Sequence, residues 1–312
     1  MIAVALARDG RKFLHILKRA DYMYVPYILL FTFLAYVFSS LGYVFVSKVF
    51  RIKAPKPYIF IVAMVTIAVN NLMAFGGVAG YTLRVFLMKS KKVGTDDVIA
   101  SSFFHTYLYT ISVTAFVPVM LFILFSRHIL DKAQSKGLLY AGFGSLAFFV
   151  FFSLIFFKRS FRLKLFHYIK ELIVKVFKRD PEKGLNRFDE VVKSGLDYLI
   201  TDPYYIPLLL SLTILDYASA ILAFHFCFKA TGTAVSGIVL VTGFIIGTSA
   251  GTASMIPGGL GVQETSMAAI YSLFGVTVRS ALLASILYRV FFYFIPIILS
   301  MIAYKLISGD ED

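Results

Sequence analysis

The sequence predicts an all-α polytopic membrane protein with about seven spans and broken or re-entrant half-helices, and three observations support this. First, 59% of the 312 residues are hydrophobic and only 15% are charged, whereas soluble domains carry about 25% charged residues. Second, uncharged runs recur that reach the roughly 20 residues needed to cross a bilayer. Third, lysines and arginines gather in the short segments between these runs. We therefore expect a single membrane domain over residues 1–312.

The uncharged runs predict where the helices lie. In chain order they cover residues 24–47, 57–83, 98–126, 137–157, 203–228 (interrupted by Asp216) and 230–304 (interrupted by Glu264, Arg279 and Arg289). The last run is too long for one span, and its Pro257-Gly258-Gly259 sequence should break it. We expect helices at about 234–256, 262–274 and 279–304. The run 57–83 should break in the same way near Gly76-Gly77.

The two glycine-rich breaks resemble each other. In the first, Gly94 follows the glycine pair by 17 residues, and in the second Gly275 follows it by 16 residues. Each later glycine precedes a long predicted helix. This pattern predicts two inverted repeats, at about 57–126 and 234–304, although glycine is also simply common in membrane helices. Broken helices in matching places of two halves point to a transport site.

Loop charge predicts the topology. Residues 1–23, 84–97 and 158–202 are rich in lysine and arginine, so the positive-inside rule places them in the cytoplasm, with the chain in the cell (inner) membrane. The net charge of +14 thus suits anionic lipid headgroups, and we expect no nucleic acid partner. Within the basic loop, residues 161–178 form an amphipathic pattern. This helix should lie on the membrane surface or pack across the end of the bundle.

Ionisable residues inside a span are functional candidates, because their burial is costly. Asp216 and Arg289 could form a structural ion pair, or could bind a headgroup or a coupling proton. Glu264 opens the helix after the second break, where the helix dipole favours a carboxylate and free backbone N–H groups bind phosphate. Arg84 could hold a phosphate with two hydrogen bonds, or could be an ordinary positive-inside charge. His105 could be an interfacial residue or part of a proton relay.

The candidate lipid-binding residues are polar or lie in the breaks. They are Asn71, Gly76, Gly77, Gly80, Arg84, Asp216, Pro257, Gly258, Gly259, Gly261, Gln263, Glu264 and Arg289. No nucleotide motif or catalytic triad order appears. The five histidines have no acidic partners at ligand spacing, and the single cysteine cannot build a thiolate site. We therefore expect no cofactor, no metal and no enzymatic activity.

The stretch Pro257–Glu264 (PGGLGVQE), with Gly275 and Arg289, resembles the flippase-like transmembrane family. This family is the membrane half of lysylphosphatidylglycerol synthases and also occurs as stand-alone proteins. The stretch from Asn71 to Arg84 is similar to its first conserved region, although Phe75-Gly76-Gly77 stands where a proline-containing turn is usual.

The resemblance implies movement of a polar-headgroup lipid across the bilayer, either passive or ion-coupled. The lipid would be an anionic or aminoacylated phospholipid or a lipid-linked sugar, and a separate lipid-modifying enzyme is a possible partner. The soluble domain of the fused synthases is not expected here, so aminoacyl transfer is not assigned. The alternatives are a membrane-embedded transferase that acts on lipid-linked substrates, and a partner protein that recruits another enzyme through residues 158–202.

Overall fold

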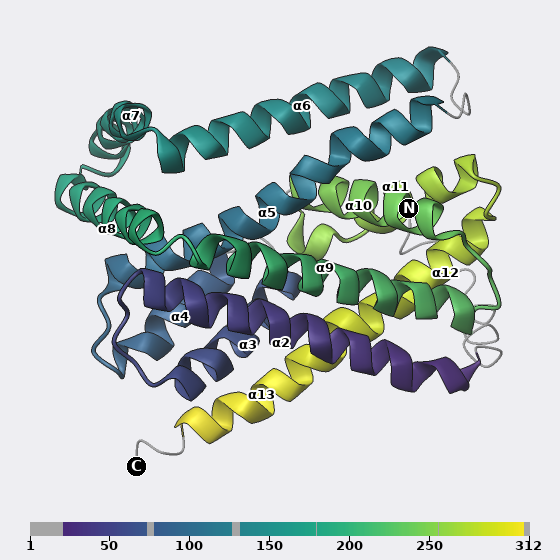
Figure 1. Ribbon diagram of the computed structural model, residues 1–312, viewed down its shortest axis with the longest axis horizontal. Helices are drawn as coiled ribbons and strands as arrows, with labels where there is room; N and C mark the ends of the chain where they lie inside the picture. The colour runs from purple at the N-terminus through teal and green to yellow at the C-terminus, as the bar shows by residue number, and fades with distance from the viewer. Residues whose placement is uncertain (1–20, 74–77, 127–131, 179, 255, 309–312) are drawn as a thin grey trace.

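The computed structural model describes residues 21–73, 78–126, 132–178, 180–254 and 256–308, and this part of the chain is helical without strands. Most helices lie along one long axis, and α7 and α8 lie across one end (Figure 1). The elements are η1 (Tyr22–Tyr24), α2 (Val25–Val49), α3 (Lys56–Met73), α4 (Val78–Lys89), α5 (Thr95–Ser126), α6 (Lys132–Phe157), α7 (Arg159–Phe177), α8 (Glu182–Thr201), α9 (Tyr205–Ala230), α10 (Gly237–Ala253), η2 (Pro257–Gly259), α11 (Val262–Leu273), α12 (Val278–Arg289), η3 (Val290–Phe294) and α13 (Ile295–Ser308).

The prediction of an all-α polytopic membrane protein is confirmed. Four helical stretches among the described residues are long and apolar enough to cross a bilayer: Tyr22–Val49, Thr95–Ile123, Tyr205–Ala230 and Val278–Lys305. Two shorter apolar helices are α3 and α10. The second predicted break is present at η2, whereas Gly76 and Gly77 lie outside the described residues. The total of about seven spans and the boundaries of the repeats remain predictions.

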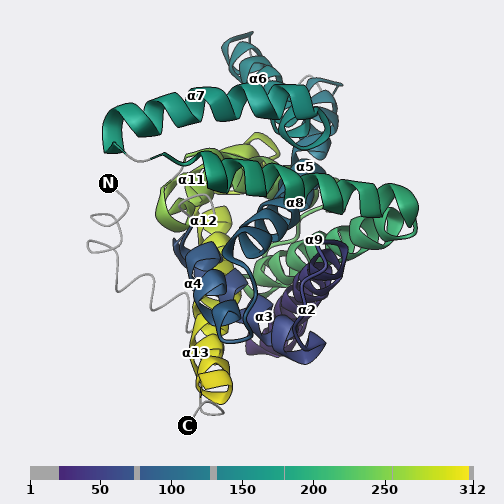
Figure 2. The same ribbon diagram turned by 90° about the vertical axis from the view of Figure 1, so that its left-hand side faces the viewer.

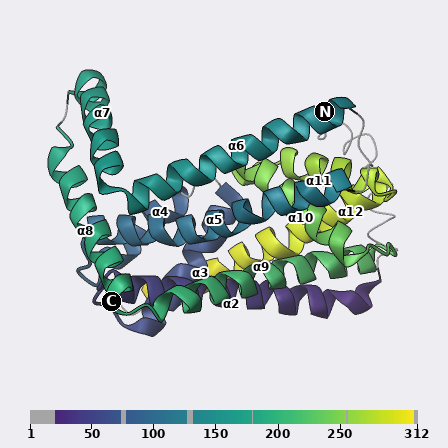
Figure 3. The ribbon, with the colours of Figure 1, turned by 45° about the horizontal axis from the view of Figure 1, so that its top comes forward.

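Helices α2 and α9 run side by side in opposite directions (Figure 3). At one end, the backbone N–H of Asp21 donates to the carbonyl of Ala230 at 2.9 Å. At the other end, the Lys48 amine lies 5.2 Å from the centre of the Tyr205 ring. The helices that follow α2 and α9 therefore start from opposite ends of the bundle.

Each of these two helices is followed by a hairpin of two shorter helices. Helix α3 packs against α4, and α10 packs against α11. Helices α4 and α11 have 12 residues each, about 18 Å of helix against about 30 Å of hydrocarbon. Each hairpin thus enters the bundle and returns toward its own end, and the two hairpins enter from opposite ends. Two hairpins that enter from opposite ends are what the predicted inverted repeat requires.

The second hairpin closes tightly because α10 presents glycines to α11. A Cβ atom on Gly243 would lie 2.4 Å from the Tyr271 ring, and one on Gly247 would lie 2.2 Å from the Met267 side chain. Small residues at such a spacing let membrane helices approach closely, where van der Waals contact replaces the hydrophobic driving force. The stripe therefore fixes α11 against α10.

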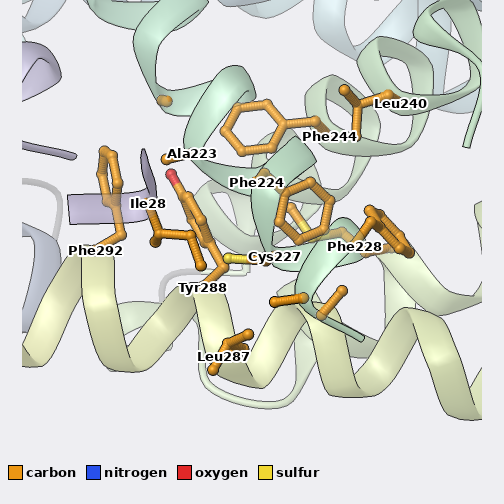
Figure 4. Packing of buried hydrophobic residues seen from close by; sticks show 14 of the residues in the cluster. Ile28, Ala223, Phe224, Cys227, Phe228, Leu240, Phe244, Leu287, Tyr288 and Phe292 are labelled. Carbon is orange, nitrogen blue, oxygen red and sulfur yellow. The ribbon is translucent and has the colours of Figure 1, made fainter. Parts of the chain in front are cut away.

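The largest buried cluster lies where α2, α9, α10, α11 and α12 meet. Phe224 and Phe228 pack edge-on at 5.0 Å between ring centres, and Tyr288 stacks on Phe292 at 4.6 Å. Figure 4 shows the only cysteine, Cys227, among these rings, and it is fully buried. As expected for a lone thiol among aromatic side chains, it acts as a small packing residue.

Helices α7 and α8 lie side by side across the end of the bundle (Figure 2). Arg162 on α7 is 1% exposed and pairs with Asp189 on α8 at 2.5 Å, which fixes the two helices together. Phe188 of α8 packs edge-on against Phe103 of α5. Helix α8 thus packs across the bundle, whereas α7 leaves apolar side chains such as Leu172 exposed.

One part of the predicted topology is wrong. Asp97, at the start of α5, lies 3.7 Å from Arg187 of α8, so residues 84–97 and 158–202 do share an end. The described chain starts at Asp21 at the opposite end, against Ala230. The charge count treated residues 57–83 as a full crossing, whereas α3 and α4 form a hairpin that returns. The start of the described chain therefore does not share a side with residues 158–202.

We predict that Gly243→Ala destabilises the protein. The new methyl group would meet a Tyr271 ring that is fully buried and held by a 2.8 Å hydrogen bond to the Leu240 carbonyl. Overpacking of this kind costs about 1–3 kcal/mol and should lower the thermal unfolding temperature in detergent. Gly144→Ala on α6 is the matched control, since nothing lies within 4 Å of its added Cβ. Equal unfolding temperatures for the two variants would contradict the close packing.

Candidate functional site

A charged pair lies at the start of α11. The guanidinium of Arg289 on α12 pairs with the carboxylate of Glu264, and both side chains are less than 10% exposed. Arg289 Nη1 also donates to the Gly258 carbonyl at 2.8 Å. Arg289 Nη2 contacts the carboxylate without the geometry of a hydrogen bond. The carboxylate in turn accepts the Gly261 N–H at 2.8 Å, so one ion pair holds the break and the next helix together.

Three glycines make this break possible. Gly258, Gly259 and Gly261 have φ values of 61°, 61° and 82°, in the left-handed region that other residues adopt only at a cost. Their turn brings the Gly258 carbonyl to Arg289 and the Gly261 N–H to Glu264. Any other residue at these positions would strain the turn that presents these groups to the charged pair.

The last span is irregular next to Arg289. Residues 290–294 form a π-helical turn, a feature often found at functional sites. Pro296 has no N–H and so frees the carbonyl four residues earlier. The Tyr36 hydroxyl of α2 donates to that carbonyl, Phe292 O, at 3.0 Å. Within the turn, Tyr293 lies 5.0 Å from Arg289 and donates to the Gln263 side chain at 3.3 Å.

The two hairpins meet at this site. A Cβ atom on Gly258 would lie 3.0 Å from the carbonyl oxygen of Leu72 and 3.7 Å from that of Asn71. The Asn71 side chain donates to the Tyr36 hydroxyl at 3.0 Å. The end of α3, the second break and the kink of the last span are therefore in contact, as expected for a site built from two broken helices.

The first hairpin is closed by an amide. The side-chain oxygen of Asn70 accepts the Gly80 N–H at 2.7 Å, and a Cβ on Gly80 would lie only 2.3 Å from that oxygen. Free N–H groups at the second break were expected to bind phosphate. In the structure the Gly80 and Gly261 N–H groups instead donate to Asn70 and Glu264, which satisfy the backbone from within the protein.

Arg84 lies apart from the charged pair. It is 1% exposed, and its guanidinium lies 3.8 Å from the centre of the Tyr43 ring. Thr66 and Ser102 accept its hydrogen bonds at 2.7–3.1 Å. No carboxylate of the described chain pairs with it. The structure thus encloses Arg84 among hydroxyl groups between α2, α3 and α5, away from the second break.

Asp216 does not pair with Arg289, the structural alternative that its depth in the sequence suggested. Its carboxyl group is buried on α9, and the residue is 4% exposed. Ser39, Tyr36, Tyr109 and Tyr217 lie near enough to interact with it electrostatically. Among the residues that the structure describes, no lysine or arginine forms an ion pair with Asp216.

Most of the predicted site residues come together. Those at the meeting point of the hairpins are Asn71, Pro257, Gly258, Gly259, Gly261, Gln263, Glu264 and Arg289. Asp216 adjoins them through Tyr36, whereas Gly80 and Arg84 lie on the other arm of the first hairpin. Sequence reasoning missed Tyr36 and Tyr293. Pro296 signalled that a carbonyl would be free one turn earlier, but no sequence feature marked the tyrosine that binds it.

We predict strong coupling between Glu264 and Arg289. Loss of one partner from a buried pair leaves an uncompensated charge and costs about 3–5 kcal/mol. Glu264→Gln and Arg289→Met should each lower the unfolding temperature in detergent, and the double variant should lose less than the sum of the two. The exposed pair Arg187–Glu190, 3.4 Å apart, is the control and should show coupling below about 1 kcal/mol. Additive effects at both pairs would contradict the prediction.

Comparison with known proteins finds relatives that match most of this chain. Relatives include the UPF0104 membrane proteins of Methanothermobacter thermautotrophicus (24% identical; 88% of this chain and 82% of the relative) and Methanocaldococcus jannaschii (22%; 96% and 90%). The phosphatidylglycerol lysyltransferase of Staphylococcus aureus is 25% identical over 85% of this chain, which spans only 27% of that protein. The lysylphosphatidylglycerol synthase TM region family matches residues 1–300, and the chain belongs to this family.

Proposed function

We propose that this protein moves a polar-headgroup lipid across the membrane, and that the meeting point of the two hairpins is its site. The observation that carries the proposal is the Glu264–Arg289 pair, enclosed in an apolar bundle at the contact between two broken helices. Charged side chains inside a membrane bundle are costly and commonly mark a substrate or ion pathway. A purely structural bundle would be more easily built from apolar side chains.

The chemistry of the pair suits a lipid headgroup. Arg289 can bind a phosphate with two hydrogen bonds, in competition with the carboxylate that it binds now. Glu264 released in this way could receive a cationic group of the same headgroup. The lysyltransferase relatives are named for phosphatidylglycerol, which supports a phospholipid substrate. We take an anionic or aminoacylated phospholipid as the first class to test, and a lipid-linked sugar as the second.

The distribution of charge supports an orientation in the cell membrane. Residues 48–56, 84–97 and 158–202 gather at the α7–α8 end, and their sequences contain nineteen of the 31 lysine and arginine residues. By the positive-inside rule this end faces the cytoplasm. The described chain would then begin, at Asp21, on the opposite side.

The orientation predicts which introduced cysteines react in intact cells. In a Cys227→Ala background, Ala234→Cys should react with a membrane-impermeant maleimide. Lys183→Cys on α8 should react only after permeabilisation, because α8 lies at the opposite end of the bundle from the α9–α10 connection. Both positions are exposed, so access to the reagent depends on the side of the membrane. The reverse labelling pattern would overturn the orientation.

Lipid movement is tested with the purified full chain in phosphatidylcholine vesicles that contain headgroup-labelled phosphatidylglycerol or phosphatidylethanolamine. The wild type should move labelled lipid between leaflets faster than protein-free vesicles. Glu264→Gln and Arg289→Ala should reduce movement to the protein-free rate, because each removes one side of the charged pair. Glu190→Gln is the control, since that exposed carboxylate lies on α8, away from the hairpins.

Two results would contradict the proposal. Unchanged movement in both Glu264→Gln and Arg289→Ala, with folded protein, would remove the site. No movement of any labelled lipid by the wild type would remove the activity and favour a membrane-embedded transferase or a recruiting partner.

A further inference from the structure

The proposed role of the Glu264–Arg289 pair in lipid movement does not involve a second buried acid, Asp216. The Asp216 carboxyl group lies on α9 among hydroxyl groups, with Ser39 and Tyr36 on α2, Tyr109 on α5 and Tyr217 on α9. A carboxylate without a cation is costly in a bundle of low polarity, whereas the neutral acid is tolerated. In the described chain, no ion pair compensates it. The site therefore suits a group that gains and loses a proton.

A line of polar groups leads from Asp216 toward the α7–α8 end. His105 Nε2 lies 3.1 Å from the backbone carbonyl of Ser39. A carbonyl oxygen can only accept, so Nε2 donates and Nδ1 remains available to accept a proton. The His105 ring packs edge-on against Tyr43, at 5.6 Å between ring centres. Gly42 permits this approach, since a Cβ there would lie 3.3 Å from Nε2.

The line continues to the start of α5. The hydroxyl groups of Tyr43 and Ser101 lie 3.1 Å apart, and Ser101 lies one helical turn after Asp97. Asp97 is partly exposed at the end of the bundle, beside Arg187. The charged groups that face this line are Arg84, which is within electrostatic range of His105, and the Asp96–Asp97 pair at its outer end.

The surroundings of Asp216 favour a proton over a transition-metal ion. Hydroxyl groups and an imidazole can pass a proton along, whereas a transition metal needs several histidine, cysteine or carboxylate ligands. No group of three or more histidine, cysteine, aspartate or glutamate side chains suited to a metal occurs in the described chain. The residue is also enclosed, at 4% exposure, so a bulky headgroup would not fit without rearrangement.

We infer that lipid movement is coupled to protons, with Asp216 as the proton-carrying group and His105 and Tyr43 as the proton-passing groups between it and the α7–α8 end. This inference rests on the proposed function. In the transfer step, a proton that enters from water at that end forms the O–H bond of the Asp216 acid. The same bond breaks when the proton leaves. At each relay group one N–H or O–H bond breaks for each one that forms, so the net change is one proton gained or lost by Asp216, and no redox partner is required.

The test uses the same vesicles with a pH indicator inside and an imposed gradient of about one pH unit, roughly a tenfold ratio of proton activity. For the wild type, the gradient should speed lipid movement, and protons should enter with the lipid. Asp216→Asn should lose proton entry by about tenfold or more, since the amide cannot titrate. Tyr43→Phe and His105→Gln should reduce it in the same direction.

The controls separate the relay from general damage. Tyr107→Phe removes a comparable phenol, which pairs with Ser153 at 3.2 Å and lies off the line, so its proton entry should match the wild type. Asp216→Glu keeps a titratable acid and should retain proton entry. If Asp216→Asn does not fold, the proton entry of Tyr43→Phe is compared with that of Tyr107→Phe, and a lower value for Tyr43→Phe supports the relay.

Wild-type lipid movement that ignores the gradient, or equal proton entry in the relay variants and the Tyr107 control, overturns the inference but leaves the proposed function standing. Absence of lipid movement even without a gradient overturns both.

Discussion

The structure depends on one constraint: a helix that breaks inside a membrane must satisfy its free backbone groups from within the protein. Three side chains do this here. Asn70 accepts the N–H of Gly80, Glu264 accepts the N–H of Gly261, and Tyr36 donates to the carbonyl that Pro296 leaves free. Asn70 thereby closes the first hairpin, and Tyr36 joins α2 to the last span. Glu264 caps its own helix and reaches the last span through Arg289.

The same constraint explains why the polar residues cluster. A carboxylate that caps a helix in hydrocarbon needs its own counter-charge, and Arg289 supplies it while binding the Gly258 carbonyl. The arginine is then steadied by the Tyr293 ring, which the π-helical turn directs toward it. The break at Pro257–Gly259 thus explains a series of contacts, each of which requires the one before it. The series runs from Glu264 through Arg289 to the neighbouring helices α2 and α3.

Much of this architecture was readable from the sequence, because proline and glycine act locally. Pro257-Gly258-Gly259 marked the break at its observed position, and the apolar runs marked the long helices. Which charged side chains pair was harder to predict, because pairing depends on how the helices are rotated relative to each other. Asp216 and Arg289 both lie deep in apolar runs, yet Arg289 pairs with Glu264, 25 residues earlier. The topology erred because hydropathy does not distinguish a hairpin that returns from a helix that crosses.

The two hairpins are fastened by different chemistry, and this makes the halves unequal. The first tip is held by a neutral amide, a bond that contributes about 1 kcal/mol in a typical protein. The second is held by a buried ion pair, whose separation exposes charge to hydrocarbon at a cost of about 3–5 kcal/mol. Parting the second tip from Arg289 therefore means separating α11 from α12, whereas the Asn70 bond closes the first hairpin on itself. An architecture that is symmetric in outline thus ties its second half to the last span through a buried ion pair that the first tip does not use.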